Sequence, residues 1–186
     1  MLGGIGLQEK TKKEVYAWTK SIAFALIIAF ICRNFLFTPT TVYGESMEPT
    51  FQEKDRVLIS KISDIQRFDI VVFNAPDEDQ RHYIKRVIGL PGDTVEMKDD
   101  VLYINGTPYE EPYVKRKSDI TLKVTSDFTL KELSGKTTVP NGYLFVLGDN
   151  RLKSRDSRSF GFISADSIIG KVKLRFFPLQ DVGIPK

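Results

Sequence analysis

Cysteine and histidine are almost missing from this chain of 186 residues, which has one of each, Cys32 and His82. A single cysteine excludes an intrachain disulfide. The two residues are also too few for a zinc site built from such ligands. The glycine-rich residues 3–6 follow no predicted strand and are too few for a phosphate-binding loop or a dinucleotide fingerprint. The sequence therefore indicates neither a zinc site of Cys and His ligands nor a nucleotide site of these kinds.

Charge of one sign is also scarce. The formal net charge is +3, which is too small to indicate a nucleic-acid partner. Hydrophobic residues make up 41% of the chain and charged residues 27%, as in an ordinary folded protein. The length suffices for one globular domain with a proper core and a small additional segment.

One uncharged run stands out near the N-terminus, at residues 21–32 between Lys20 and Arg33. As a helix it would span about 18 Å, less than the roughly 30 Å of a bilayer core. Apolar and aromatic neighbours extend it, and Lys20 and Arg33 can reach toward the two interfaces. A buried core helix would show a polar face, and a cleavable signal peptide would be followed by an A-x-A-like site. Neither is present, so we expect a retained transmembrane anchor at residues 15–37.

Basic residues indicate the orientation of this anchor. Four lysines precede the run and only Arg33 follows it closely. The positive-inside rule then places residues 1–14 in the cytoplasm and residues 38–186 outside it. The predicted localisation is the cell membrane, with a single pass and an extracytoplasmic domain.

The remainder of the chain has the pattern of a β protein. Short β-rich runs alternate with turn signals, among them Pro91-Gly92 for a type II turn and Asn105-Gly106 for a hairpin. The pattern predicts an antiparallel β barrel or sandwich with a small β insert at about residues 99–141. Residues 109–139 could also form a flexible excursion, since they are charged and weakly periodic. The predicted strands are residues 56–60, 69–73, 83–90, 94–97, 101–104, 143–147 and 171–177.

Ser46 lies in the stretch Gly44-Glu45-Ser46-Met47-Glu48-Pro49. A serine between glycine and proline is usually a turn residue. The stretch also departs from the nucleophile elbow G-x-S-x-G, because Glu48 stands at the second glycine position. A catalytic role for Ser46 therefore requires a base from elsewhere in the chain.

Two residues of the run 82–88 can supply that base. His82 would complete a Ser-His triad, and Lys85 could act as a base if burial held its amine neutral. On a strand, Lys85 shares a face with Tyr83 and Val87, which places the amine among apolar groups. Alternation does not tell which face is buried.

A third polar cluster follows the predicted strand 143–147, at residues 148–158. Such a loop can be an exposed set of turns and ion pairs, or a buried network that supports a site. In a buried network, a hydroxyl such as that of Ser154 can orient a neutral lysine amine.

Taken together, these motifs resemble those of the type I signal peptidases, also called leader peptidases. The resemblance includes the nucleophile box at residues 46–50, the lysine box at residues 85–93, the late box at residues 148–158 and a weaker box at residues 69–73. Their order, their spacing and the preceding apolar segment also fit. The resemblance covers nearly the whole chain, and the short insert is similar to that of the smaller Gram-positive members.

The resemblance implies a membrane-anchored serine endopeptidase that removes signal peptides from secretory precursors, beside the lipid bilayer. It implies Ser46 as nucleophile, with its backbone N–H as an oxyanion donor, and Lys85 as general base. It also implies that Ser154 orients Lys85 and that Asp149, Asp156 and Arg158 hold the late loop. It implies no metal and no organic cofactor. Gly44 and Met47 would flank the nucleophile in the substrate and oxyanion region.

Gly44 departs from those members that carry Ser or Thr two residues before the nucleophile, where the hydroxyl is a second oxyanion donor. Loss of such a donor can cost about 10²–10³ in rate. A backbone N–H or a water could substitute for it.

Three alternatives remain open from the sequence. A soluble self-cleaving repressor shares a Ser-Lys dyad and a β fold, but the anchor and the missing DNA-binding domain argue against it. An anchored, non-enzymatic domain could bind extracellular partners. A Ser-His triad through His82 is the remaining mechanistic alternative.

Overall fold

The computed structural model describes residues 4–31, 36–116 and 123–185 of the chain. The chain divides into two compact units, Met1–Thr38 and Pro39–Lys186. The first unit consists mainly of one helix and the second is built from strands.

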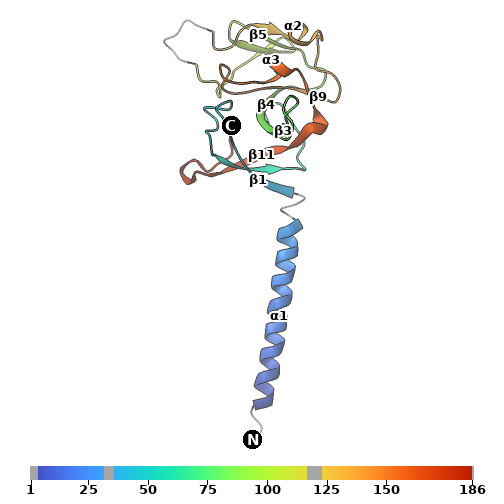
Figure 1. Ribbon diagram of the computed structural model, residues 1–186, viewed down its shortest axis with the longest axis vertical. Helices are drawn as coiled ribbons and strands as arrows, with labels where there is room; N and C mark the ends of the chain where they lie inside the picture. Colours follow the sequence, from blue (N-terminus) through green and yellow to red (C-terminus); the bar gives the residue numbers. More distant parts are fainter. Residues whose placement is uncertain (1–3, 32–35, 117–122, 186) are drawn as a thin grey trace. The chain divides into compact units, whose positions relative to one another are not determined.

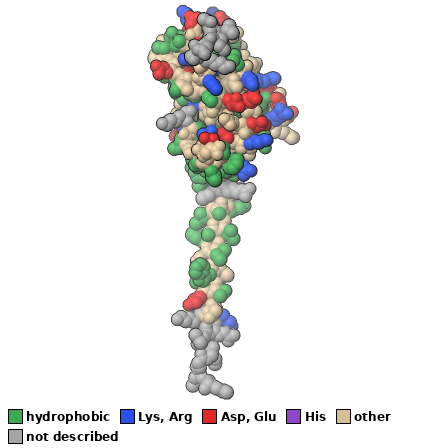
Figure 2. All heavy atoms as spheres, turned by 90° about the vertical axis from the view of Figure 1, so that its left-hand side faces the viewer, with side chains coloured by type: hydrophobic (Ala, Val, Ile, Leu, Met, Phe, Trp, Pro, Cys, Tyr) green, Lys and Arg blue, Asp and Glu red, His purple; other side chains and the backbone are tan. Residues whose placement is uncertain are grey.

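Helix α1 runs from Gly4 to Ile31 and has 28 residues. Its side chains from residue 11 to residue 30 are exposed, including Trp18, Phe24 and Leu26. Figure 2 shows apolar side chains along the visible face of this helix. Within the described residues, no helix has both the length and the apolar character needed to cross a membrane. The predicted anchor at residues 15–37 includes residues 32–35, which lie outside the described residues, and it stays a prediction.

The second unit has two β-sheets, and every strand pair with a described register is antiparallel. The prediction of a mainly antiparallel β fold is thus confirmed. The seven-stranded sheet has the order β1-β2-β11-β3-β4-β9-β10 and the four-stranded sheet the order β7-β6-β5-β8. The larger sheet contains β1 (Phe37–Thr41), β2 (Arg56–Ser60), β3 (Ile70–Asn74), β4 (His82–Gly89), β9 (Tyr143–Leu147), β10 (Ile163–Ser164) and β11 (Ile168–Phe177).

The smaller sheet consists of β5 (Val95–Lys98), β6 (Val101–Ile104), β7 (Thr107–Tyr109) and β8 (Phe128–Thr129), followed by helix α2 (Leu130–Ser134). It includes β5, which precedes the predicted insert of residues 99–141. Residues 117–122 of that insert lie outside the described residues. In Figure 1, β5 and α2 lie at one end of the β domain and β11 at the other, with β3 and β4 between them.

Two predicted turns agree with the structure. Gly92 has a φ of 87°, and the Asp93 N–H donates to the Leu90 carbonyl oxygen at 3.0 Å. Asn105 and Gly106 have φ values of 54° and 76°, as a type I′ hairpin turn requires. Helix α3 (Ser157–Phe160) and the 3₁₀ turns η2 (Ala165–Ser167) and η3 (Leu179–Asp181) complete the elements.

Strand β4 connects the parts of the core. Ile84 packs with residues of β2, β3 and β11, whereas Val87 packs with β9 and Ile88 with the smaller sheet. A strand with apolar neighbours on both faces is buried on both faces. Any polar side chain in the middle of β4 is therefore withdrawn from water.

Candidate active site

The nucleophile loop follows β1 and is held to the core by the two residues that flank its turn. Met47 and Phe51 are both fully buried in the cluster beneath β2 and β3. The Phe51 N–H donates to the Met47 carbonyl oxygen at 2.9 Å. Ser46 immediately precedes Met47 and is only partly buried. The predicted substrate-region residue Met47 is therefore a core anchor, and its side chain does not face solvent.

Lys85 of β4 lies opposite Ser46, and the structure brings the two together as predicted. Its Nζ donates to Ser46 Oγ at 2.8 Å and to the Ile84 carbonyl oxygen at 3.0 Å. The amine also lies 5.3 Å from the centre of the Tyr83 ring, on the face that strand alternation indicates. Lys85 is 3% exposed. Burial lowers the pKa of Lys85 to about 8, although Asp156 and Asp149 act in the opposite direction.

His82 is placed differently. It begins β4, where it is exposed and pairs with Asn74 of β3. The hydrogen bond at Ser46 Oγ comes from Lys85.

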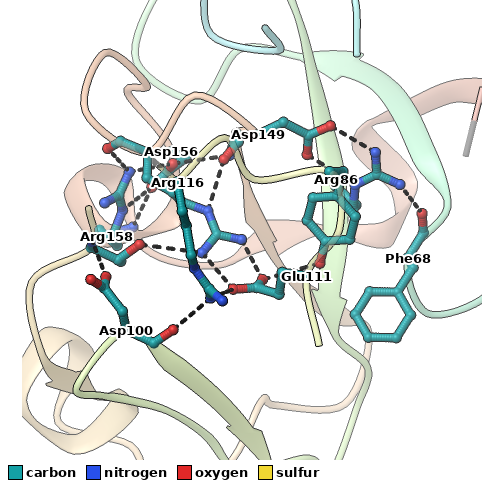
Figure 3. Close-up of polar contacts among 12 residues, drawn as sticks. Phe68, Arg86, Asp100, Glu111, Arg116, Asp149, Asp156 and Arg158 are labelled. Carbon is teal, nitrogen blue, oxygen red and sulfur yellow. Dashed lines mark hydrogen bonds and ion pairs between the residues drawn. The ribbon is translucent and has the colours of Figure 1, made fainter. Parts of the chain in front are cut away.

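Asp149 is held by a residue that the sequence analysis did not select. Arg86 donates from Nε to Asp149 Oδ1 at 2.9 Å and from Nη2 to Oδ2 at 2.7 Å (Figure 3). The Thr50 hydroxyl, four residues after the nucleophile, donates to the same carboxylate. The side chains of Arg86 and Asp149 are 3% and 0% exposed. The pair thus joins β4, the nucleophile loop and the late loop inside the protein.

Asp156 and Arg158 form the second pair of the late loop. Arg158 donates from Nε and Nη2 to Asp156 at 2.8 Å each. Asp156 Oδ2 also accepts from the Gly148 N–H at 3.0 Å, and Asp156 caps helix α3. A carboxylate at an N-cap satisfies helix N–H groups that would lack partners. The next residue, Ser157, is buried and its hydroxyl accepts from the Val146 N–H at 3.0 Å.

Ser154 lies against Gly148, where a Cβ atom added to the glycine would meet Ser154 Oγ at 2.1 Å. This hydroxyl is buried and makes no hydrogen bond with any described residue. The predicted contact with Lys85 is therefore not made, and a role for Ser154 in orienting Lys85 stays a prediction.

An open groove of about 920 Å³ leads to Ser46 and Lys85. Gly44 lines it with a φ of 78°, and a Cβ atom added there would meet no atom within 4 Å. The left-handed φ favours glycine at this position. Across the groove, β4 pairs with β9 only from Arg86 onward, so the edge of residues 82–85 that faces away from β3 has no described strand partner. Such an edge can accept an extended peptide.

The sequence analysis did not select Arg86, Arg151 or Glu111 as site residues, although Arg151 lies in the late box. Arg151 donates from Nη1 and Nη2 to the Glu111 carboxylate. Arg86 follows Lys85 directly and lies in the lysine box, so its position next to the base could be seen in the sequence. Glu111 lies in the insert, and no local pattern distinguishes it from Glu110.

Within the described ranges, no group of three or more His, Cys, Asp or Glu residues could hold a metal ion.

Comparison with known proteins assigns the chain to a protein family. A sequence model of the family described as "Signal peptidase, peptidase S26" matches residues 15–177. The chain belongs to the signal peptidase family S26. This confirms the resemblance, and the protein is accordingly a serine peptidase of the signal peptidase I type.

Relatives in this family match over most of their length. The signal peptidase I of Bacillus amyloliquefaciens is 44% identical over 183 residues, which are 94% of this chain and 96% of that protein. The signal peptidase IB of Staphylococcus aureus strain COL is 42% identical over 183 residues, which are 91% and 93% of the two chains.

A crystal structure of a signal peptidase I from Enterococcus faecalis V583 is also similar. It has 49% sequence identity and a TM-score of 0.56, and the match covers 59% of this chain and 97% of that chain. The β fold is thus the fold of a signal peptidase I.

Proposed function

We propose that the protein removes N-terminal signal peptides from secretory precursors, with Ser46 as nucleophile and Lys85 as general base. The observation that carries this proposal is the 2.8 Å hydrogen bond from Lys85 Nζ to Ser46 Oγ. The substrate class is taken from the relatives, which are named signal peptidases.

In this mechanism, neutral Lys85 accepts the Ser46 proton as Ser46 Oγ attacks the carbonyl carbon of the scissile bond. The Ser46 backbone N–H stabilises the oxyanion. Collapse of the tetrahedral intermediate breaks the C–N bond, and the Lys85 ammonium gives its proton to the leaving amine. An ester on Ser46 remains. Lys85 then takes a proton from water, whose oxygen attacks the ester carbonyl carbon. The ester C–O bond breaks, the Lys85 ammonium returns the proton to Ser46 Oγ, and the signal peptide is released.

The substrate would bind as an extended strand along residues 82–85 of β4. This edge lines the groove and has no strand partner within the described residues, and such an edge can pair with an extended peptide. On the opposite side, the chain from Pro39 to Ser46 lines the same groove. Binding between two backbone segments would bring the scissile carbonyl to Ser46 Oγ.

We further propose that residues 15–37 anchor the protein in the cell membrane, with the N-terminus in the cytoplasm and the catalytic domain outside. The uncharged run at residues 21–32 and the lysines before it support this orientation. Precursor and enzyme would then share one bilayer, which raises their effective concentration.

The test compares three variants, Ser46→Ala, Lys85→Ala and His82→Ala, each reconstituted in lipid with a secretory precursor. We expect the first two to lose cleavage and His82→Ala to keep it. An inactive but folded His82→Ala, with an active Lys85→Ala, would replace the dyad by a Ser-His triad. A Ser46→Ala variant that cleaves like the parent would refute the peptidase mechanism and favour a binding domain.

A further inference from the structure

Two side chains from the insert are buried beside the residues that support the dyad. Glu111 is 4% exposed and Tyr113 is 9% exposed. The Tyr113 hydroxyl donates to Glu111 Oε1 at 3.1 Å, and its ring lies 3.9 Å beneath the Arg86 guanidinium. Burial and the neighbouring Glu111 carboxylate raise the pKa of Tyr113, so the phenol remains a donor. The mechanism proposed above uses neither residue.

Glu111 is paired with Arg151 of the late loop. Arg151 donates from Nη1 and Nη2 to the two carboxylate oxygens at 3.1 Å and 2.5 Å. Both side chains are buried. Removal of one partner from a buried pair leaves an uncompensated charge, which is far costlier than loss of an exposed pair. Figure 3 shows Glu111 beside Arg116, whose Nη2 is 4.0 Å from the carboxylate and lies nearer the surface.

The pair continues toward the nucleophile through the backbone. Arg151 Nε donates to the Gly148 carbonyl oxygen at 3.0 Å, while the Gly148 N–H donates to Asp156. A Cβ atom at Gly148 would lie 2.5 Å from the Ser46 carbonyl oxygen, so this glycine touches the nucleophile's own backbone. The Asn150 N–H donates to the same Ser46 oxygen at 3.0 Å. The loop 148–151 therefore sets the position of Ser46.

The carboxylates around Lys85 are themselves paired with cations. The carboxylates of Asp149, Asp156 and Asp77 act on Lys85. Each has a guanidinium partner, which is Arg86, Arg158 and Arg155 respectively. At the groove mouth, Lys153 pairs with Glu45 and Glu78 accepts from Tyr83. Glu111 and Arg151 are a further neutral pair, so deletion of either charge alone unbalances the site.

We propose that Glu111 is a positioning residue of the Ser46-Lys85 site, acting through Arg151 and Gly148. The insert is then part of the catalytic apparatus. The inference rests on the proposed function, because it assigns Glu111 to that same dyad.

The experiment compares Glu111→Gln, Arg151→Gln and the double variant in the full-length protein in lipid. The matched control is Asp127→Asn, which breaks an exposed ion pair with Lys123 in the same insert. Unfolding midpoints, kcat, KM and the pH dependence of kcat are measured for each, with a precursor as substrate.

We expect Glu111→Gln to lower kcat about 10–100-fold with a small change in KM, because misplacement of a nucleophile costs rate. Loss of the Glu111 charge would move the acid limb of the kcat profile down by about half a pH unit, and loss of the Arg151 charge in Arg151→Gln would move it up. The double variant would return the limb toward the parent. The control would match the parent throughout.

Equal kcat and an unmoved limb in folded Glu111→Gln would overturn the proposal, as would limbs that move in the same direction in both single variants. If Glu111→Gln does not fold, the double variant, which leaves no lone buried charge, takes its place, and a parental kcat there overturns it. Activity that survives in Ser46→Ala would instead refute the proposed function, whatever Glu111 does.

Discussion

Among single residues, Lys85 shows most directly how burial produces chemistry. An exposed lysine is protonated at neutral pH and accepts no proton. On β4 the same amine is 3% exposed and has a pKa lowered to about 8. A base whose pKa is near the working pH is partly deprotonated at that pH, and it still binds a proton strongly enough to take one from a hydroxyl.

The first prediction concerns the pH dependence of cleavage. Since Lys85 acts only when neutral, kcat/KM should rise with pH and level off above a midpoint near the Lys85 pKa of about 8. The measurement is kcat/KM between about pH 6 and about pH 10, the range in which this lysine titrates. Disappearance of the limb in His82→Ala would assign the limb to the histidine.

The second prediction concerns stability. The pKa of Lys85 falls from 10.5 to about 8 on folding, so between these values the unfolded chain binds more protons. Lys85 therefore lowers the free energy of unfolding by its full amount below about pH 8. This loss decreases as the pH rises and disappears above pH 10.5. Lys85→Met should therefore be more stable than the parent at pH 7, by on the order of 3 kcal/mol. Urea unfolding at pH 7 and pH 10 checks this, and an unchanged difference between the two pH values would contradict it.

The third prediction concerns Gly148. Alanine there would place a Cβ atom 2.1 Å from Ser154 Oγ and 2.5 Å from the Ser46 carbonyl oxygen. We expect Gly148→Ala to lose about 10²-fold or more in kcat, because the nucleophile is displaced. Gly183→Ala is the control, since a Cβ atom there meets nothing within 4 Å. Similar activity of the two variants would show that the loop yields to the methyl group.

At the scale of elements, Asp93 joins the turn after β4 to the hairpin between β6 and β7. It accepts from Arg67 Nη1 at 2.7 Å, from the Leu90 N–H at 2.6 Å and from Asn105 Nδ2 at 2.8 Å. Burial works to raise the pKa of Asp93, but the bonds from Arg67, Leu90 and Asn105 hold it below its usual value. One carboxylate thus ties the two sheets together.

The fourth prediction is that Asp93→Asn lowers the free energy of unfolding by about 1–3 kcal/mol at pH 7, because charged hydrogen bonds are lost. A depressed carboxyl pKa stabilises the folded state above the unfolded pKa of about 3.9, and this stability is lost as pH falls further. The difference from the parent should therefore shrink in acid. Urea unfolding at pH 7 and at about pH 3.5 measures it, and a difference that grows in acid would contradict the assignment.

At the scale of the whole molecule, the chain has two compact units with separate contact networks, Met1–Thr38 and Pro39–Lys186. The groove, the dyad and the supporting pairs all lie in the second unit. The rate of peptide-bond cleavage should therefore depend on the second unit. The first unit should affect how readily the enzyme reaches a membrane-embedded substrate.

The fifth prediction follows from this division. A chain that begins at Leu36 should unfold like the β domain of the parent and cleave a short water-soluble peptide at a rate within about twofold. Cleavage of a precursor embedded in vesicles should fall by about 10²-fold or more, since the shared membrane no longer concentrates both partners. Equal rates on the embedded precursor would contradict the proposed anchor.

Much of this protein could be predicted from local sequence. Alternation and turn residues indicated the strands, because side-chain direction along a strand and φ at glycine are local properties. Ser46, Lys85 and the acidic and basic residues of the late loop were visible as short motifs. The strands β7, β8 and β10 were missed because two or three residues carry too little periodicity. Strand β1 was missed as well, and Pro39 in its middle is unusual in a strand.

The burial of Lys85 and the partners of its neighbours depend on the fold. Both faces of β4 are mixed in sequence, and the packing of β2, β9 and the smaller sheet decides that Lys85 is withdrawn from water. Glu111 meets Arg151 across 40 positions, and Arg86 meets Asp149 across 63. No local pattern reports such pairs, because the energy of a buried charge depends on which distant residue folds against it.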